Sequence, residues 1–167
     1  EEWRANTGAE YSFCLMEELY VTEDHETVKI YPAKSRYMEV DKSGYSRNLT
    51  MAEGIVESNS KPKYDNIVYD RYRDVYYRFC RMKDTKTSPK VFLDRGYYQC
   101  LSDFSILILN SDLEVMGETL FEAGVYAPKL FFVNKDGLWL SENNYQREDI
   151  TDDVLKFRCL KLVENEE

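Results

Sequence analysis

Histidine is nearly absent from this sequence, since His25 is the only one among 167 residues. A Ser-His-Asp or Cys-His nucleophilic site needs such a base. His25 lies among carboxylates in the polar stretch Thr22–Glu26, and no nucleophile pattern points toward it. We interpret it as a solvated turn residue. The sequence therefore assigns no catalytic residue, and we expect neither a metal site nor another cofactor.

Long apolar runs and basic clusters are also missing. No stretch of about 18 apolar residues predicts a transmembrane helix. With 22 Lys and Arg against 31 Asp and Glu, the formal net charge is −9, which repels phosphate backbones and argues against nucleic-acid binding. The chain begins at Glu1 instead of Met, without a signal-peptide pattern. We expect a processed or excised segment.

The four cysteines form no C-x-x-C pair, so the spacing typical of metal ligands is absent. Cys14, Cys80 and Cys159 lie within apolar strand patterns, and we expect them to be buried free thiols. A disulfide between Cys80 and Cys100 is conceivable, but sequence alone does not establish the geometry it needs.

A sustained 3.6-residue period is missing too, and paired strand patterns take its place. Residues 104–121 read as strand, polar turn and strand, and residues 129–142 repeat this around Asp136-Gly137, a strong hairpin signal. The recurring theme is a turn that contains Asp or Asn. The expected strands are 11–19, 27–31, 66–70, 74–82, 90–93, 104–110, 113–121, 129–133, 138–142 and 154–163, and Met51–Val56 is either a helical turn or an edge strand.

This pattern predicts an all-β fold of antiparallel β-propeller-like blades. A propeller closes with roughly 4–8 blades of about 40–50 residues, so a chain of 167 residues would be a partial ring. A self-contained β-sandwich is the alternative. We divide the chain into a hairpin and loop-rich segment at 1–63, two blade-like sheets at 64–163 and an acidic tail at 164–167.

Two charged residues interrupt apolar strands. Arg78 stands within VYYRFC and Glu118 within VMGETLF, and charges are rarely buried unless they are paired. We expect a cross-strand ion pair between them. Alternatively, Arg78 faces a channel with Tyr77 or Tyr126 and holds a carboxylate ligand. The candidate ligand-binding residues are thus Arg78, Tyr77, Glu118 and Tyr126.

Carboxylates cluster in one loop. Glu148, Asp149, Asp152 and Asp153 lie close together, but the loop lacks the glycine and the ligand order of a calcium loop. We interpret it as a solvated acidic loop. Two suitably spaced carboxylates could hydrolyse a glycosidic bond, which makes an envelope hydrolase using Glu118, Asp149 and Asp152 an alternative function.

Four segments carry a resemblance to a known family: YDRYRDVYYRF, FSILILNSDLEVMGETLF, KLFFVNKDGLWLSE and DDVLKFRCLKL. Over roughly residues 60–163 the chain resembles the C-terminal half of domain-of-unknown-function family 4221, found in exported proteins of Bacteroides-like bacteria. The resemblance implies a β-propeller-like fold and an envelope location, in the periplasm or lipid-anchored to the outer membrane. It implies no activity.

We therefore expect a binding or scaffold module of the cell envelope. Its partners would be an unknown protein or glycan ligand, together with the remaining propeller blades from the missing part of the chain. The 14 tyrosines suit half-buried pleated surfaces. A third possibility is a β-sandwich that serves only protein contacts.

Overall fold

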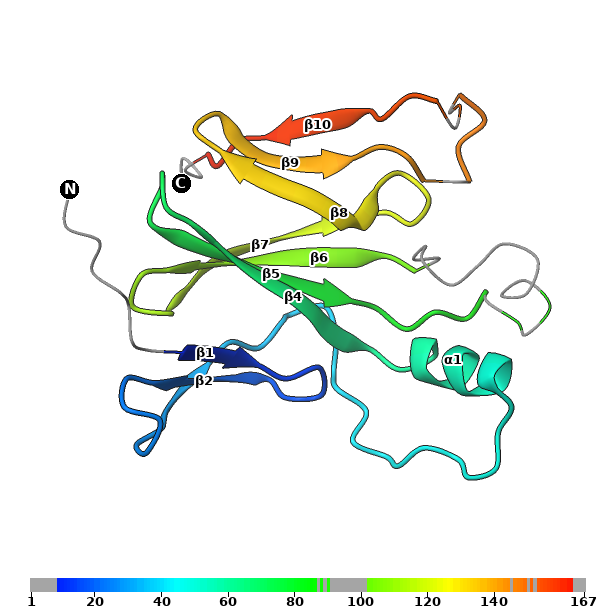
Figure 1. The fold of residues 1–167 in the computed structure, drawn as a ribbon, viewed down its shortest axis with the longest axis horizontal. Helices are drawn as coiled ribbons and strands as arrows, with labels where there is room; N and C mark the ends of the chain where they lie inside the picture. Colours follow the sequence, from blue (N-terminus) through cyan, green and yellow to red (C-terminus); the bar gives the residue numbers. More distant parts are fainter. Residues whose placement is uncertain are drawn as a thin grey trace.

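The computed structural model describes residues 9–86, 88, 90, 102–144, 146–149, 151 and 153–163. These residues form three antiparallel sheets stacked face to face, with one short helix at the end of the middle sheet (Figure 1). The predicted all-β class is confirmed, and none of the sheets closes into a barrel in the described ranges. In this part of the chain, no helix has the length and apolarity needed to span a bilayer.

Each sheet is a meander in which consecutive strands are neighbours. The lower, middle and upper sheets are named by their place in Figure 1. The lower sheet contains β1 (Ala9–Ser12), β2 (Glu18–Thr22) and β3 (Lys29–Pro32); the middle sheet contains β4 (Lys63–Asp70), β5 (Val75–Arg81), β6 (Phe104–Asn110) and β7 (Val115–Phe121); the upper sheet contains β8 (Ala127–Asn134), β9 (Gly137–Ser141) and β10 (Phe157–Leu160).

The expected strand at 11–19 is wrong, because a turn divides it. β1 ends at Ser12 and β2 begins at Glu18, and the amide of Met16 donates to the carbonyl of Phe13 at 3.2 Å between them. The polar stretch Thr22–Glu26, where a turn was expected, joins β2 to β3. The last strand is shorter than expected, and the expected strand at 90–93 lies mostly outside the described residues.

The helix α1 (Met51–Asn59) decides between the two structures considered for Met51–Val56. Its N-terminus is a capping box: the Thr50 side chain accepts from the amide of Glu53, whose carboxylate accepts from the amide of Thr50. The pattern T-x-x-E is a sequence signal for such a start. The start of α1 could therefore have been predicted from the sequence alone.

Three hairpin turns are stabilised in the same way by an Asp or Asn side chain. The side chains of Asp70, Asn110 and Asn134 each end a strand and accept amide hydrogens from the turn that follows, at distances of 2.8 to 3.3 Å. Asp and Asn favour turns because their side chains replace a backbone acceptor in this way. The predicted theme of turns with Asp or Asn is confirmed.

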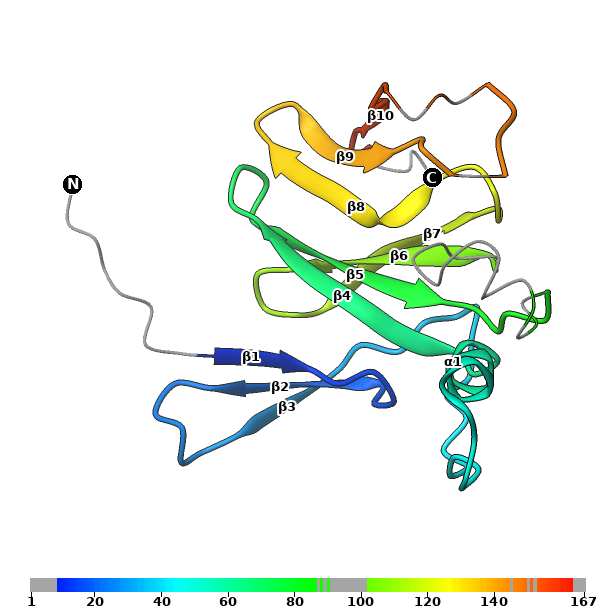
Figure 2. The same cartoon turned by 45° about the vertical axis from the view of Figure 1, so that its right-hand side comes forward.

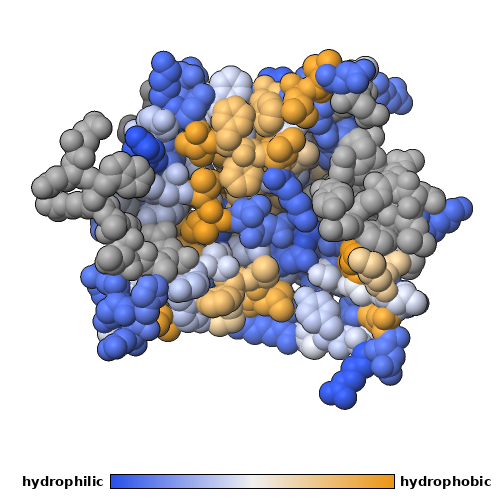
Figure 3. Space-filling model, viewed as in Figure 1, coloured by the Kyte–Doolittle hydropathy of each residue, from blue (hydrophilic) through white to orange (hydrophobic). Residues whose placement is uncertain are grey.

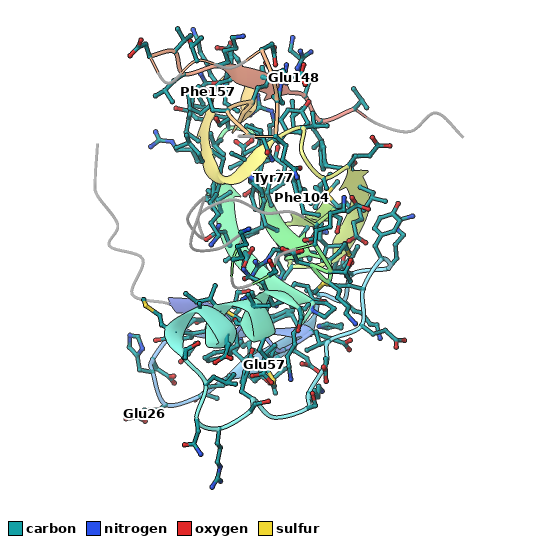
Figure 4. All side chains as sticks on the ribbon, turned by 90° about the vertical axis from the view of Figure 1, so that its right-hand side faces the viewer. Glu26, Glu57, Tyr77, Phe104, Glu148 and Phe157 are labelled. Atoms are coloured by element: carbon teal, nitrogen blue, oxygen red, sulfur yellow. The ribbon has the colours of Figure 1, made fainter. Side chains whose placement is uncertain are left out.

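Strand alternation gives the middle sheet two buried faces. Cys80, Leu107 and Leu109 pack toward the lower sheet with Leu19, while Phe79 and Ile106 pack with Leu138 and Leu140 of the upper sheet. Figure 4 shows Tyr77 and Phe104 between the middle and upper sheets. The middle sheet is thus the element that holds the stack together.

Gly137 allows a close approach between strands. An added Cβ atom would lie 2.3 Å from the carbonyl oxygen of Leu160 on β10. Gly137→Ala should therefore lower the free energy of unfolding by about 1–3 kcal/mol through steric overlap, measured by urea denaturation. Gly117→Ala is the control, since nothing lies within 4 Å of its added Cβ atom. Equal stability of the two variants would contradict this account of Gly137.

Candidate functional site

The four candidate ligand-binding residues divide between the two faces of the middle sheet. Arg78 pairs with Leu107, which pairs with Glu118, so both charged residues stand in one cross-strand row that faces the lower sheet. Tyr77 directly precedes Arg78 on β5 and faces the upper sheet. Tyr126 packs against that same upper cluster.

Arg78 is completely buried and its hydrogen-bonding capacity is filled. Nε donates to Ser12 Oγ at 3.2 Å. The two terminal nitrogens donate to four backbone carbonyl oxygens, those of Met16, Glu17, Glu18 and Ala33, at 2.8 to 3.4 Å. A guanidinium has five N–H donors, and each has an acceptor in the lower sheet or its connection to the middle sheet.

The positive charge of Arg78 is stabilised by an aromatic ring in addition to the carbonyl oxygens. The guanidinium carbon of Arg78 lies 3.6 Å from the centre of the Tyr64 ring, a cation–π contact. Burial lowers the pKa of Arg78, while Tyr64, Cys80 and Glu18 oppose that shift. Burial also raises the pKa of Tyr64 to about 12, so its hydroxyl stays neutral and accepts from the Ser35 amide at 3.0 Å.

Glu118 holds the connection that leaves the lower sheet. Its side chain is 1% exposed. The carboxylate accepts from the hydroxyls of Ser35 and Ser105 at 2.5 Å and from the amide of Arg36 at 2.8 Å, and Arg36 Nε lies 3.6 Å away. The carboxylate is thus compensated by hydroxyl, amide and guanidinium groups.

The expected ion pair between Arg78 and Glu118 is wrong. The two residues share a row but β6 separates their strands, and each binds groups from residues 12–36 instead. Both therefore fix the lower sheet to the middle sheet. A ligand carboxylate at Arg78 would have to displace one of its five acceptors, so ligand binding by these residues stays a prediction.

The opposite face carries a second polar network. The hydroxyl of Tyr77 donates to buried Asp70 at 3.2 Å, and Arg73 Nη1 donates to the same carboxylate at 2.7 Å. Arg73 also donates to the carbonyl oxygens of Asn134 and Lys135, at 3.1 and 2.8 Å, in the turn between β8 and β9. This arginine attaches the upper sheet as Arg78 attaches the lower one.

Beside Tyr77 lies an apolar pocket of about 360 Å³ between the middle and upper sheets. β6 and β7 contribute Ile106, Ile108, Thr119 and Phe121, and β9 and β10 contribute Leu138, Cys159 and Leu160, with residues 161–163 completing the wall. Tyr126 meets the edge of the Phe121 ring at a centroid distance of 5.7 Å. The apolar lining suits hydrophobic side chains.

Of the carboxylates proposed for hydrolysis, Glu118 and Asp149 are not brought together. Glu118 faces the lower sheet, whereas Asp149 lies in the loop beyond β9 and binds Arg147 at 2.8 Å, which lowers its pKa to about 2. Asp152 lies outside the described residues. No group of three or more His, Cys, Asp or Glu residues suited to a metal ion occurs in the described part of the chain.

The cysteines differ from one another. Cys80 is buried and free, as predicted, and burial raises the pKa of its thiol to about 12. Cys14 is exposed, so its predicted burial is wrong, and Cys159 is half-buried. Cys14 follows β1 in the turn to β2, where strand alternation no longer holds. Cys100 lies outside the described residues.

Sequence reasoning missed Arg73, Asp70 and Ser35. The Asp-x-x-Arg spacing of Asp70 and Arg73 across a turn was visible, and such a pair forms an ion pair in this structure at 2.7 Å. Ser35 carried no signal, because its partner Glu118 is 83 residues away.

A family model described as Domain of unknown function (DUF4221) matches residues 5–120. The crystal structure of a member of that family from Bacteroides vulgatus is similar at 34% sequence identity and a TM-score of 0.79, covering 93% of this chain and 42% of that chain. The chain thus spans less than half the length of this relative. No curated protein matches.

Arg78→Met should lower the free energy of unfolding by about 3 kcal/mol or more, because five acceptors around a fully buried guanidinium lose their donor. Arg71→Met is the matched control, since Arg71 is exposed on the turn after β4 and contacts the Tyr72 ring. Chemical denaturation of both variants measures the difference. A stable Arg78→Met variant would show that the lower sheet does not depend on this guanidinium.

Proposed function

The chain belongs to the family described as Domain of unknown function (DUF4221), and from this premise we propose that it is part of a β-propeller-like protein of the cell envelope. In this proposal it acts as a binding or scaffold module for a protein or glycan ligand. The envelope location rests on the resemblance to exported proteins.

The observation that carries the proposal is the arrangement of the three sheets. β4 lies beside β1 and beside β8, so the same edge of each sheet meets the next. β4 and β8 point in the same direction in Figures 1 and 2. Meandering sheets that stack around a common line of edge strands are the architecture of propeller blades.

The outer faces of the stack support further neighbours. Phe132 of the upper sheet is 44% exposed and packs with Trp139 and Phe157, at centroid distances of 5.8 and 5.1 Å. On the lower sheet, Phe13 is 51% exposed and meets the ring of Tyr20 at 5.5 Å. Figure 3 shows apolar side chains gathered over both outer sheets, with a hydrophilic band between them.

Exposed apolar patches of this kind mark interaction surfaces. The solved relative is more than twice as long as the part matched here, since the match covers 42% of it. Further sheets of a longer polypeptide are therefore the natural occupants of both faces in this proposal. That occupancy would complete a ring which three sheets leave open.

A surface for ligand binding lies at the turn after β4. Tyr69 and Tyr72 are 46% and 53% exposed, and the Tyr72 ring also contacts the Arg71 guanidinium at 5.5 Å. Exposed aromatic rings beside arginines are favoured at protein interfaces. Since β4 belongs to the common line of edge strands, this turn would open at the mouth of the central channel.

Self-association tests the incomplete ring. This chain should form concentration-dependent oligomers, measured by sedimentation, and Phe132→Lys should weaken them by placing a charge within the exposed aromatic cluster. Leu49→Lys is the control, because Leu49 is 39% exposed on a loop before α1. A sharp, monomeric unfolding transition of the unsubstituted chain would instead mean that the stack needs no neighbours.

Ligand binding needs a separate experiment. The protein is screened against a glycan array and a peptide library, and Tyr72→Ala should weaken the strongest hit about tenfold or more, as loss of an interface hot spot does. Tyr45→Ala, which removes an aromatic ring 47% exposed on another loop, should leave binding unchanged. Turnover of a screened compound would overturn the binding role, and recovery of the expressed protein outside the envelope fraction would overturn the location.

A further inference from the structure

Among the residues that the structure describes, the upper sheet has three strands, whereas the middle sheet beside it has four. β8 and β9 lie over the first strands of the middle sheet, and β7 has no counterpart in the upper sheet among the described residues. We propose that the free edge of β10 receives one further antiparallel strand, which completes the upper sheet and fills the pocket next to β7. This inference rests on the proposed function.

The hydrogen bonds of β10 show that its edge is ready for pairing. The Glu142 amide donates to the carbonyl oxygen of Lys156 at 2.9 Å, in the same register that pairs β9 with β10. Antiparallel ladders alternate between bonded and non-bonded residue pairs. Arg158 and Leu160 therefore bond toward β9, and the amide and carbonyl groups of Phe157 and Cys159 point away from it.

The position of Gly137 independently confirms which backbone groups of β10 point toward β9. The carbonyl oxygen of Leu160 approaches Gly137 closely enough to lie 2.3 Å from an added Cβ atom. That carbonyl consequently points toward β9, as the register requires. In the described ranges β10 pairs with β9 alone, so the outward groups of Phe157 and Cys159 present an edge without a strand. Such edges are templates for strand addition.

The face of the middle sheet beside this edge is only partly covered by the upper sheet. Tyr77 of β5 and Ile106 of β6 are buried, at 4% and 3% exposure, under the strands of the upper sheet. Further along the same face, Thr119 of β7 is exposed and Phe121 is half-buried. Both line the 360 Å³ pocket. β7 is thus covered poorly where the upper sheet ends.

These features define the occupant. It is an extended segment of about five residues, long enough to pair along β10 at the usual rise per residue. Apolar side chains at alternate positions would enter the pocket toward Thr119 and Phe121. This strand would be antiparallel to β10 and would therefore run in the same direction as β9. In the middle sheet, β7 is likewise antiparallel to its neighbour β6.

The source of the strand is the longer polypeptide. The solved relative is matched over only 42% of its chain, and each incomplete sheet of a ring requires its missing strand from the same molecule if the molecule is to remain a monomer. A second copy that pairs edge to edge is the competing source. The experiment separates the two.

The test uses a proline at the outward-facing amide. Cys159→Pro removes an N–H that β9 does not use, and proline is tolerated at such edge positions. It is compared with Cys159→Ala, which keeps the N–H, in this chain and in a polypeptide extended to the length of the relative. We expect Cys159→Pro to lower the Tm by about 2–4 °C more than Cys159→Ala in the extended protein, and to match it in this chain.

Hydrogen exchange of the unsubstituted proteins gives a second readout that does not depend on the variants folding. The amides of Phe157 and Cys159 should exchange at least about 100-fold more slowly in the extended protein than in this chain, while Arg158 and Leu160 stay protected in both. Equal exchange of the outward amides would overturn strand addition and leave the exposed-face proposal intact.

The competing source has its own signature. If oligomers of this chain disappear with Cys159→Pro but persist with Cys159→Ala, a second copy pairs at the edge. Protection of Cys159 that depends on protein concentration would show the same. Either result would overturn the assignment of the strand to the longer polypeptide.

Discussion

The stack depends on burying the guanidinium of Arg78 among carbonyl oxygens. A charge at this depth is tolerated only where its lost hydration is replaced, and the turn before β2 and the connection after β3 supply the acceptors. The same contacts bind the turn between β1 and β2 to the middle sheet. One side chain of the middle sheet thereby contacts both the beginning and the end of the lower sheet.

The middle sheet binds its two neighbours in the same manner. Arg73 lies in the turn between β4 and β5, the strand that carries Arg78, and it donates to carbonyl oxygens of the turn between β8 and β9. Across the interfaces between the sheets, both arginines donate hydrogen bonds to backbone carbonyl oxygens and not to a carboxylate. Apolar side chains pack between the sheets, while the directed hydrogen bonds of the two guanidinium groups select one relative placement of the sheets.

The sequence predicts what local chemistry controls. Alternation and the Asp and Asn turns give the strands of the middle and upper sheets, and the capping box was available for α1. The partners of Arg78 were not available, because they are carbonyl groups some 60 residues away that every residue type carries. The pairing rule for charges suggested Glu118, which has the correct row but satisfies its carboxylate from Ser35 and Arg36.

Attachment through carbonyl groups has an evolutionary consequence. The oxygens that Arg78 contacts belong to Met16, Glu17, Glu18 and Ala33, and their side chains can be exchanged without removing those bonds. Selection would then hold the arginine fixed while the residues it grips drift. A sheet attached in this way could be duplicated or recombined among genes, since a new sheet needs a suitable backbone turn and not a matching sequence.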